Sequence, residues 1–304
     1  MRISTQAASQ SALMDLMKAQ RDSFDAREQL STGKKAPDLK GYGNAAETIL
    51  TARAAKVRAD SFATANERLA NRLEVQDLAY RELSDAANQL RTALTTADGT
   101  ALMAQVQEAF DRTVGALGTK FAGSFVFSGA RTDYAPVNAQ TLGDLQAAAP
   151  NTSAVFTDPG RRQSARIDED TVIDVNRTAE EVAGGLMAVF ERIADFDAGT
   201  EGPFDGPVSE IQQAFLRTEI ANVISAFETI NDAMGENGAK QARLERSIVA
   251  HKERSDYLTE MTAGIEDADM AEAASRFQQG QTAVEVSART FASLSQVSLL
   301  PFLR

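Results

Sequence analysis

Several residue types are scarce or missing in this chain of 304 residues. It has no cysteine and no tryptophan, a single histidine, and only 6% aromatic residues. Without cysteine the chain forms no disulfide, no thiolate nucleophile and no cysteine-bound zinc or iron–sulfur site. One histidine without cysteine cannot complete a catalytic triad or a zinc cage. These absences exclude a disulfide-stapled secreted module and the cysteine-dependent enzymes.

Long apolar runs are missing as well. No stretch of about 18 apolar residues occurs, so we expect no membrane insertion. The first residues lack a basic segment followed by a continuous apolar one, so we expect no cleaved signal peptide. The chain has 31 Lys and Arg against 43 Asp and Glu, which gives a formal net charge of -12. This balance argues against nucleic acid as the main partner.

Helical periodicity dominates what is present. An amphipathic helix is predicted over 3–30, followed by a Gly- and Pro-containing linker at 31–43 in which Gly33 can end the helix. Between 45 and 96, apolar residues recur at alternating spacings of three and four, which is a heptad seam with two polar interruptions. The seam consists of Ala52, Ala55, Ala59, Phe62, Asn66, Leu69, Leu73, Gln76, Tyr80, Leu83, Ala87, Leu90 and Leu94. A helix of this length, about 75 Å, predicts a rod-like bundle.

The middle of the chain has a different pattern. The glycine-flanked segment Phe125–Phe127 has the composition of a strand, and residues 161–167 and 171–175 alternate around an acidic turn. We therefore expect a small β-rich insertion over 120–176. A helix from about 101 to 118 precedes it.

Helices return after the insertion. Thr178 with Glu181 and Ser209 with Gln212 each have the spacing of a capping box. We expect a break at 234–238, where two glycines occur, and then a long helical region whose apolar seam changes phase near 267.

The predicted fold class is mainly α. Long helices from both ends of the chain form an antiparallel rod or coiled-coil bundle, with the small β-rich insertion between them. We predict a terminal coiled-coil assembly region at 1–43 plus 267–304, a long-helix bundle at 44–119 plus 177–266, and an outer β-rich insertion at 120–176.

Two acidic clusters and the single histidine could suggest a metal or catalytic site. Asp168, Asp170 and Asp174 lack the ligand and glycine positions of an EF-hand, so a solvated turn is predicted. The cluster Glu266, Asp267 and Asp269 is expected to cap the restarted helix and not to bind a metal. His251 lies on a heptad seam and is expected in the core or on its flank. We find no nucleophile–base pair and no phosphate loop, and we predict no enzyme, no cofactor and no metal.

The two terminal helices are the remaining candidates for function. Each has a thin apolar stripe rich in Ala, Gln and Ser, and each is set apart from the bundle by the linker or the phase change. Such helices are marginal alone but would bury their stripes among many copies. The predicted assembly residues are Leu13, Leu16, Met17, Phe24, Leu30, Met270, Phe277, Val284, Phe291, Leu294, Leu299, Leu300 and Phe302.

Short motifs at both ends resemble a known family. They are M-R-I-S-T at 1–5, L-S-T-G-K-K at 30–35, G-S-F-V-F-S-G-A-R-T-D-Y-A-P at 123–136, I-E-D-A-D-M-A-E-A at 265–273, Q-T-A at 281–283 and S-L-L-P-F-L at 298–303. The chain resembles the flagellin superfamily of bacterial flagellar axial proteins, and within it the hook-associated protein 3 group of the hook–filament junction. The linker at 36–43 departs from the family pattern.

The resemblance implies a structural protein of the extracellular flagellum, exported without a cleaved leader. It implies self-assembly into a ring or tube through the terminal helices. The implied partners are a neighbouring hook-associated protein, flagellin and, before secretion, a flagellar export chaperone. Two alternatives remain at this point: a filament flagellin, and a secreted adhesion or binding protein that uses the β insertion.

Overall fold

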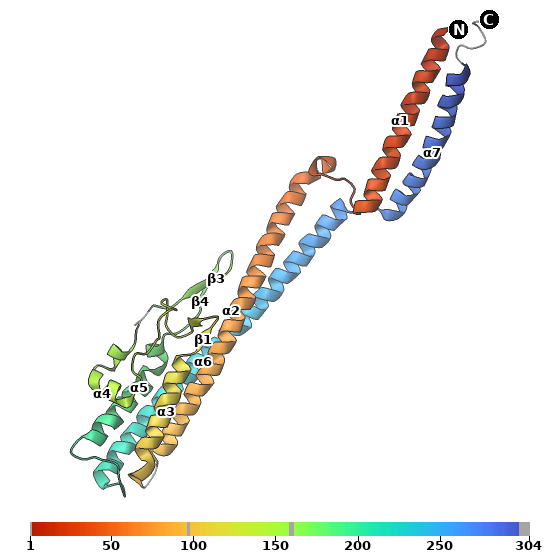
Figure 1. The fold of residues 1–304 in the computed structure, drawn as a ribbon. Coiled ribbons are helices and arrows are strands. Elements are labelled where there is room, and N and C mark those ends of the chain that lie inside the picture. Colours follow the sequence, from red (N-terminus) through yellow and green to blue (C-terminus); the bar gives the residue numbers. More distant parts are fainter. Residues whose placement is uncertain (1, 96–97, 158–160, 298–304) are drawn as a thin grey trace. The chain divides into compact units, whose positions relative to one another are not determined.

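The computed structural model describes residues 2–95, 98–157 and 161–297 and is dominated by helices (Figure 1). The α-helices are α1 (Arg2–Thr32), α2 (Ala45–Ala93), α3 (Leu102–Leu117), α4 (Leu142–Ala148), α5 (Ala179–Ala198), α6 (Glu210–Glu266) and α7 (Met270–Val297). The short 3-10 helices are η1 (Leu39–Tyr42), η2 (Gly99–Ala101) and η3 (Thr152–Val155). The predicted mainly α fold with long antiparallel helices is confirmed.

Two small antiparallel sheets account for the strands. β1 (Lys120–Phe121) pairs with β2 (Ser124–Phe125), and β3 (Ser164–Asp168) pairs with β4 (Thr171–Asp174) around the predicted acidic turn. Val126 and Phe127 lie beyond β2 and are buried, so only the start of the predicted Phe125–Phe127 strand is a strand. These two residues serve as core side chains of the bundle.

The chain divides into two compact units, Met1–Ala59 with Glu253–Arg304, and Asp60–Lys252. The second unit holds the main apolar core, which lies among α2, α3, α5 and α6. Its largest fully buried side chains include two pairs in edge-to-face contact. Tyr80 meets Phe127 with ring centroids 5.3 Å apart, and Phe110 meets Phe190 at 5.6 Å.

The heptad seam predicted for α2 faces α6. Asn66 and Gln76, the two polar residues that interrupt the seam, both make hydrogen bonds. The Asn66 amide donates a hydrogen bond to the Ile167 carbonyl at 2.9 Å, and the Gln76 amide donates to the Tyr80 hydroxyl at 2.9 Å. Both polar side chains are buried. The amide nitrogens of both residues are therefore paired, whereas the buried Gln76 Oε1 accepts no hydrogen bond.

The predicted break at 234–238 is wrong, because α6 runs unbroken through it. Gly235 and Gly238 are exposed helical positions, and the helix tolerates them at a modest cost. The Asn237 amide between them donates to the Leu73 carbonyl of α2 at 2.9 Å, and Glu236 pairs with Arg177 at 2.6 Å. These contacts with distant parts of the chain hold the helix where local propensity predicts an end.

The predicted helix caps and boundaries agree with the structure. Thr178 with Glu181 forms a reciprocal capping box at α5, and Ser209 with Gln212 forms one at α6. Gly33 follows α1 with φ +70°, the left-handed conformation that glycine adopts without strain. The phase change near 267 is a true break between α6 and α7.

Candidate assembly site

The two terminal helices, α1 and α7, lie side by side and antiparallel in their own unit (Figure 1). Among the α1 residues whose burial is described, the buried ones are Ala12, Ala19 and Ala26, which recur every seven residues, and α7 places Ala273 and Gly280 in the same seam. A Cβ at Gly280 would lie 3.0 Å from the Ser23 Cα. Small side chains therefore bring the two backbones into close contact.

Helix α1 carries a second apolar stripe. The buried alanines and the half-buried Leu16 and Leu30 form an inner seam at alternating spacings of three and four. Leu13, Met17 and Phe24 form a separate row, which we call the outer stripe. At about 100° per residue, the outer stripe lies roughly 120° around the helix from the inner seam. Met17 and Phe24 are 54% and 64% exposed, so this stripe has no cover in the monomer.

The structure sorts the predicted assembly residues into three groups. The first group is half-buried in the hairpin and alternates with the small residues of the seam. It consists of Leu16, Leu30, Phe277, Val284 and Phe291. Those that are exposed are Leu13, Met17, Phe24 and Met270. Leu294 belongs to α7, and Leu299, Leu300 and Phe302 lie outside the described residues. The role of all these residues in assembly stays a prediction.

Two exposed apolar residues of these helices were missed from the sequence. Met14 is 68% exposed on α1 and Val286 is 58% exposed on α7. Met14 is three residues before Met17, a spacing that places the two side by side on a helix. A search for one stripe per helix leaves such flanking residues out.

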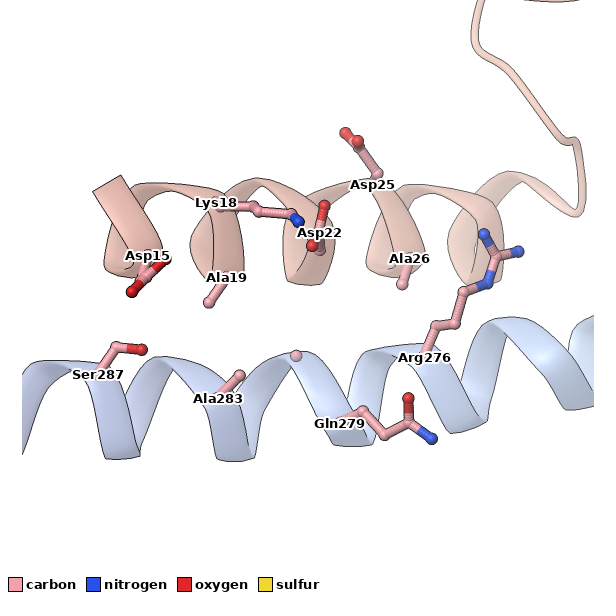
Figure 2. Close-up of a pocket in the computed structure, with 11 residues that line it drawn as sticks. Asp15, Lys18, Ala19, Asp22, Asp25, Ala26, Arg276, Gln279, Ala283 and Ser287 are labelled. Atoms are coloured by element: carbon pink, nitrogen blue, oxygen red, sulfur yellow. The ribbon is translucent and has the colours of Figure 1, made fainter. Parts of the chain in front are cut away.

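A groove of about 610 Å³ runs along another side of the hairpin. Figure 2 shows Ala19 pointing at α7 and Ala283 and Ser287 pointing back at α1. The α1 wall of the groove also carries charged residues, Asp15, Lys18, Asp22 and Asp25, and the α7 wall carries Arg276. The small seam residues Ala19, Ala26 and Gly280 also line this groove.

The motifs at 30–35 and 265–273 meet in space, in the connector between the hairpin and the long helices. Lys34 and Asp267 form an antiparallel bridge, and the Lys35 amide donates to the Glu266 carbonyl at 2.7 Å. The Lys35 ammonium donates to the carbonyls of Gly264 and Ile265 at 3.1 and 2.8 Å. These are among the last carbonyls of α6, where a cation also complements the helix dipole.

The acidic cluster of the connector has divided roles. Asp269 accepts hydrogen bonds from the amides of Ala271 and Glu272, so it caps α7 as predicted. Asp267 instead pairs with the Lys34 ammonium at 2.6 Å, and this hydrogen bond raises the pKa of Lys34 above its ordinary value. Glu266 is buried and also ion-paired. The prediction that the whole cluster caps the helix is therefore wrong for Glu266 and Asp267.

The predicted core position of His251 is confirmed in the Asp60–Lys252 unit. Its ring stacks on Phe62 with centroids 5.1 Å apart, and its Nε2 lies 3.2 Å from the Ile167 carbonyl oxygen. A shallow pocket of about 550 Å³ lies beside it, between the β3–β4 hairpin and α6. Among the residues that the structure describes, no three His, Asp or Glu side chains are grouped to hold a metal ion.

Comparison with known proteins identifies one family region and a shared fold. Residues 220–303 match the family model of the bacterial flagellin C-terminal helical region. No curated protein matches the chain. Two solved structures share the fold. A protein of Vibrio parahaemolyticus, described as a flagellar hook-associated protein, is 16% identical with a TM-score of 0.58, over 73% of this chain and 97% of that one. FlgL of Bacillus cereus is 12% identical with a TM-score of 0.51, over 69% and 96%.

In the part of the chain that the structure describes, none of the helices has the length and apolar character that crossing a bilayer requires. The matched family region covers all but the first ten residues of α6 and all of α7, which form one side of the connector and of the terminal hairpin. Residues 220–303 therefore resemble the bacterial flagellin C-terminal helical region, and the resemblance to flagellar proteins predicted from the sequence is confirmed at the level of this region and of the fold.

Proposed function

We propose that this chain is a structural subunit of the bacterial flagellum that assembles through its terminal helices and forms the junction between hook and filament. The observation that carries the proposal is the outer stripe of α1, an exposed apolar row on a helix whose inner seam is already paired with α7. Apolar residues that recur along one exposed helix face are typical of a helix–helix interface. Neighbouring copies of the chain would cover the stripe in an assembled ring or tube.

The fold shared with FlgL and with a hook-associated protein supports the junction role over a filament role. Under this proposal the chain contacts a neighbouring hook-associated protein on one side and flagellin on the other. An export chaperone would hold it before export through the flagellar type III channel. The subunit performs no catalysis. The comparisons do not favour a secreted binding protein that uses the β insertion.

Immunogold labelling of intact flagella tests the position of the subunit. Antibody against this chain should mark one narrow zone at the distal end of each hook. Labelling along the whole filament would identify a filament flagellin and overturn the junction role. Absence of label from flagella that are otherwise complete would overturn the flagellar assignment altogether.

A further inference from the structure

We propose that Glu266 is the positioning residue of the terminal hairpin. Its carboxylate joins the linker after α1 to the first turns of α2 and the last turn of α6, and so fixes how the hairpin leaves these helices. This inference rests on the proposed function only for its consequence, which is that a fixed hairpin assembles more readily than a loose one.

Glu266 holds two cations from different parts of the chain. The Lys34 ammonium lies 3.3 Å from its Oε2, and the Arg53 guanidinium lies 2.7 Å from its Oε1. The Glu266 side chain is 5% exposed, whereas those of Lys34 and Arg53 are 41% and 55% exposed. The contact with Arg53 is an ion pair without hydrogen-bond geometry, because Oε1 accepts no hydrogen bond. A buried charge depends on such partners, so loss of the carboxylate charge removes both ion pairs.

Among the described residues of the connector, no apolar side chain is buried, although Leu39, Tyr42 and Ile265 are half-buried. Within residues 33–43 and 264–272, which are all described, Glu266 is the one buried residue. The linker also contains Gly33, Gly41 and Gly43, so its backbone has few intrinsic restraints. The one side chain buried in the connector is therefore a charged one.

Hydrogen bonds beside Glu266 hold the linker after α1 against the segment that joins α6 to α7. The Ala268 amide donates to the Gly33 carbonyl at 2.9 Å, and the Lys35 amide donates to the Glu266 carbonyl at 2.7 Å. Tyr42 adds a hydroxyl that donates to the Ala36 carbonyl at 3.0 Å. These bonds lie at the surface beside the Lys34–Asp267 pair and the contacts of the Lys35 ammonium, and Glu266 adds the buried charge at their centre.

The decisive variant is Glu266→Gln in the full chain, followed by amide hydrogen exchange. We expect exchange at the Lys35 and Ala268 amides to rise about tenfold, because neutral hydrogen bonds replace charge-assisted ones. The matched control is Glu272→Gln, which removes an exposed pair with Arg276 four residues away and should leave both amides unchanged. Lys34→Gln, at an exposed position, should give a smaller rise.

The positioning role would be overturned if both amides exchange at the wild-type rate in Glu266→Gln and also in Lys34→Gln. Unfolding of the Asp60–Lys252 unit is measured in parallel and should stay at the wild-type midpoint, since Glu266 lies outside that unit. Assembly of the variant should require a higher subunit concentration. Assembly at the wild-type concentration despite faster exchange would overturn the consequence for assembly. If the wild-type chain is absent from flagella, the proposed function is overturned. The hydrogen-exchange result would still test the positioning role of Glu266 independently.

Discussion

The Asp60–Lys252 unit and the terminal hairpin bury opposite kinds of side chain. The Asp60–Lys252 unit encloses large residues such as Tyr80, Phe110, Phe127 and Phe190, all fully buried. The hairpin buries alanines and a glycine and leaves Phe24 exposed. Burial of large apolar groups is the dominant favourable term in folding, so we expect the Asp60–Lys252 unit to be the more stable of the two. The hairpin half-buries Leu16, Phe277 and Phe291 and leaves Met17 and Phe24 exposed.

Replacement of one phenylalanine in each region should produce the largest difference. Phe190→Ala removes a fully buried ring from its edge-to-face contact with Phe110 and should lower the free energy of unfolding by about 3–5 kcal/mol. Phe24→Ala should change it by less than about 0.5 kcal/mol, because Phe24 is exposed. Urea unfolding followed by circular dichroism measures both. Equal losses would show that the hairpin is part of the same cooperative core.

Replacement of one glycine by alanine in each region should give effects of opposite sign. Gly280→Ala places a methyl group 3.0 Å from the Ser23 Cα and should cost roughly 1–3 kcal/mol of hairpin pairing. Gly235→Ala, at an exposed position of α6 with no atom within 4 Å of the new Cβ, should stabilise its helix by about 0.5–1 kcal/mol. Hydrogen exchange in α7 and in α6 measures the two effects. A gain at Gly280 would mean that the seam is looser than its packing indicates.

The sequence predicts the long helices and much of the bundle seam well. The α2 pattern places Leu73, Leu83 and Leu90 inside, because a strict heptad has only one face to bury. The break at 234–238 was predicted from local glycine content and is wrong, since the Asn237 contact with α2 overrides it. Such contacts link residues far apart in the sequence and leave no local signal.

The terminal site is predictable only in part. Leu13 and Leu16 both follow helical spacing, and nothing in that spacing shows which of them α7 covers. The small residues Ala12, Ala19 and Ala26 determine which face of α1 contacts α7, because the two backbones can approach closely only where side chains are small. Glu266 was expected to cap a helix, and its pairing with Lys34 and Arg53 appears only when three separate segments meet.

The central claim is that the outer stripe of α1 is covered by neighbouring subunits. The direct test is the triple variant Leu13→Ser, Met17→Ser and Phe24→Ser, expressed in a flagellated bacterium without its own copy. The matched controls are Ile211→Ser and Val172→Ser, exposed apolar residues of the Asp60–Lys252 unit.

The amount of the chain retained on flagella is compared with the amount released to the medium. The account predicts that the triple variant is exported at the wild-type level, is recovered in the medium and is absent from flagella, whereas both controls are retained. Retention of the triple variant at the wild-type level would contradict it.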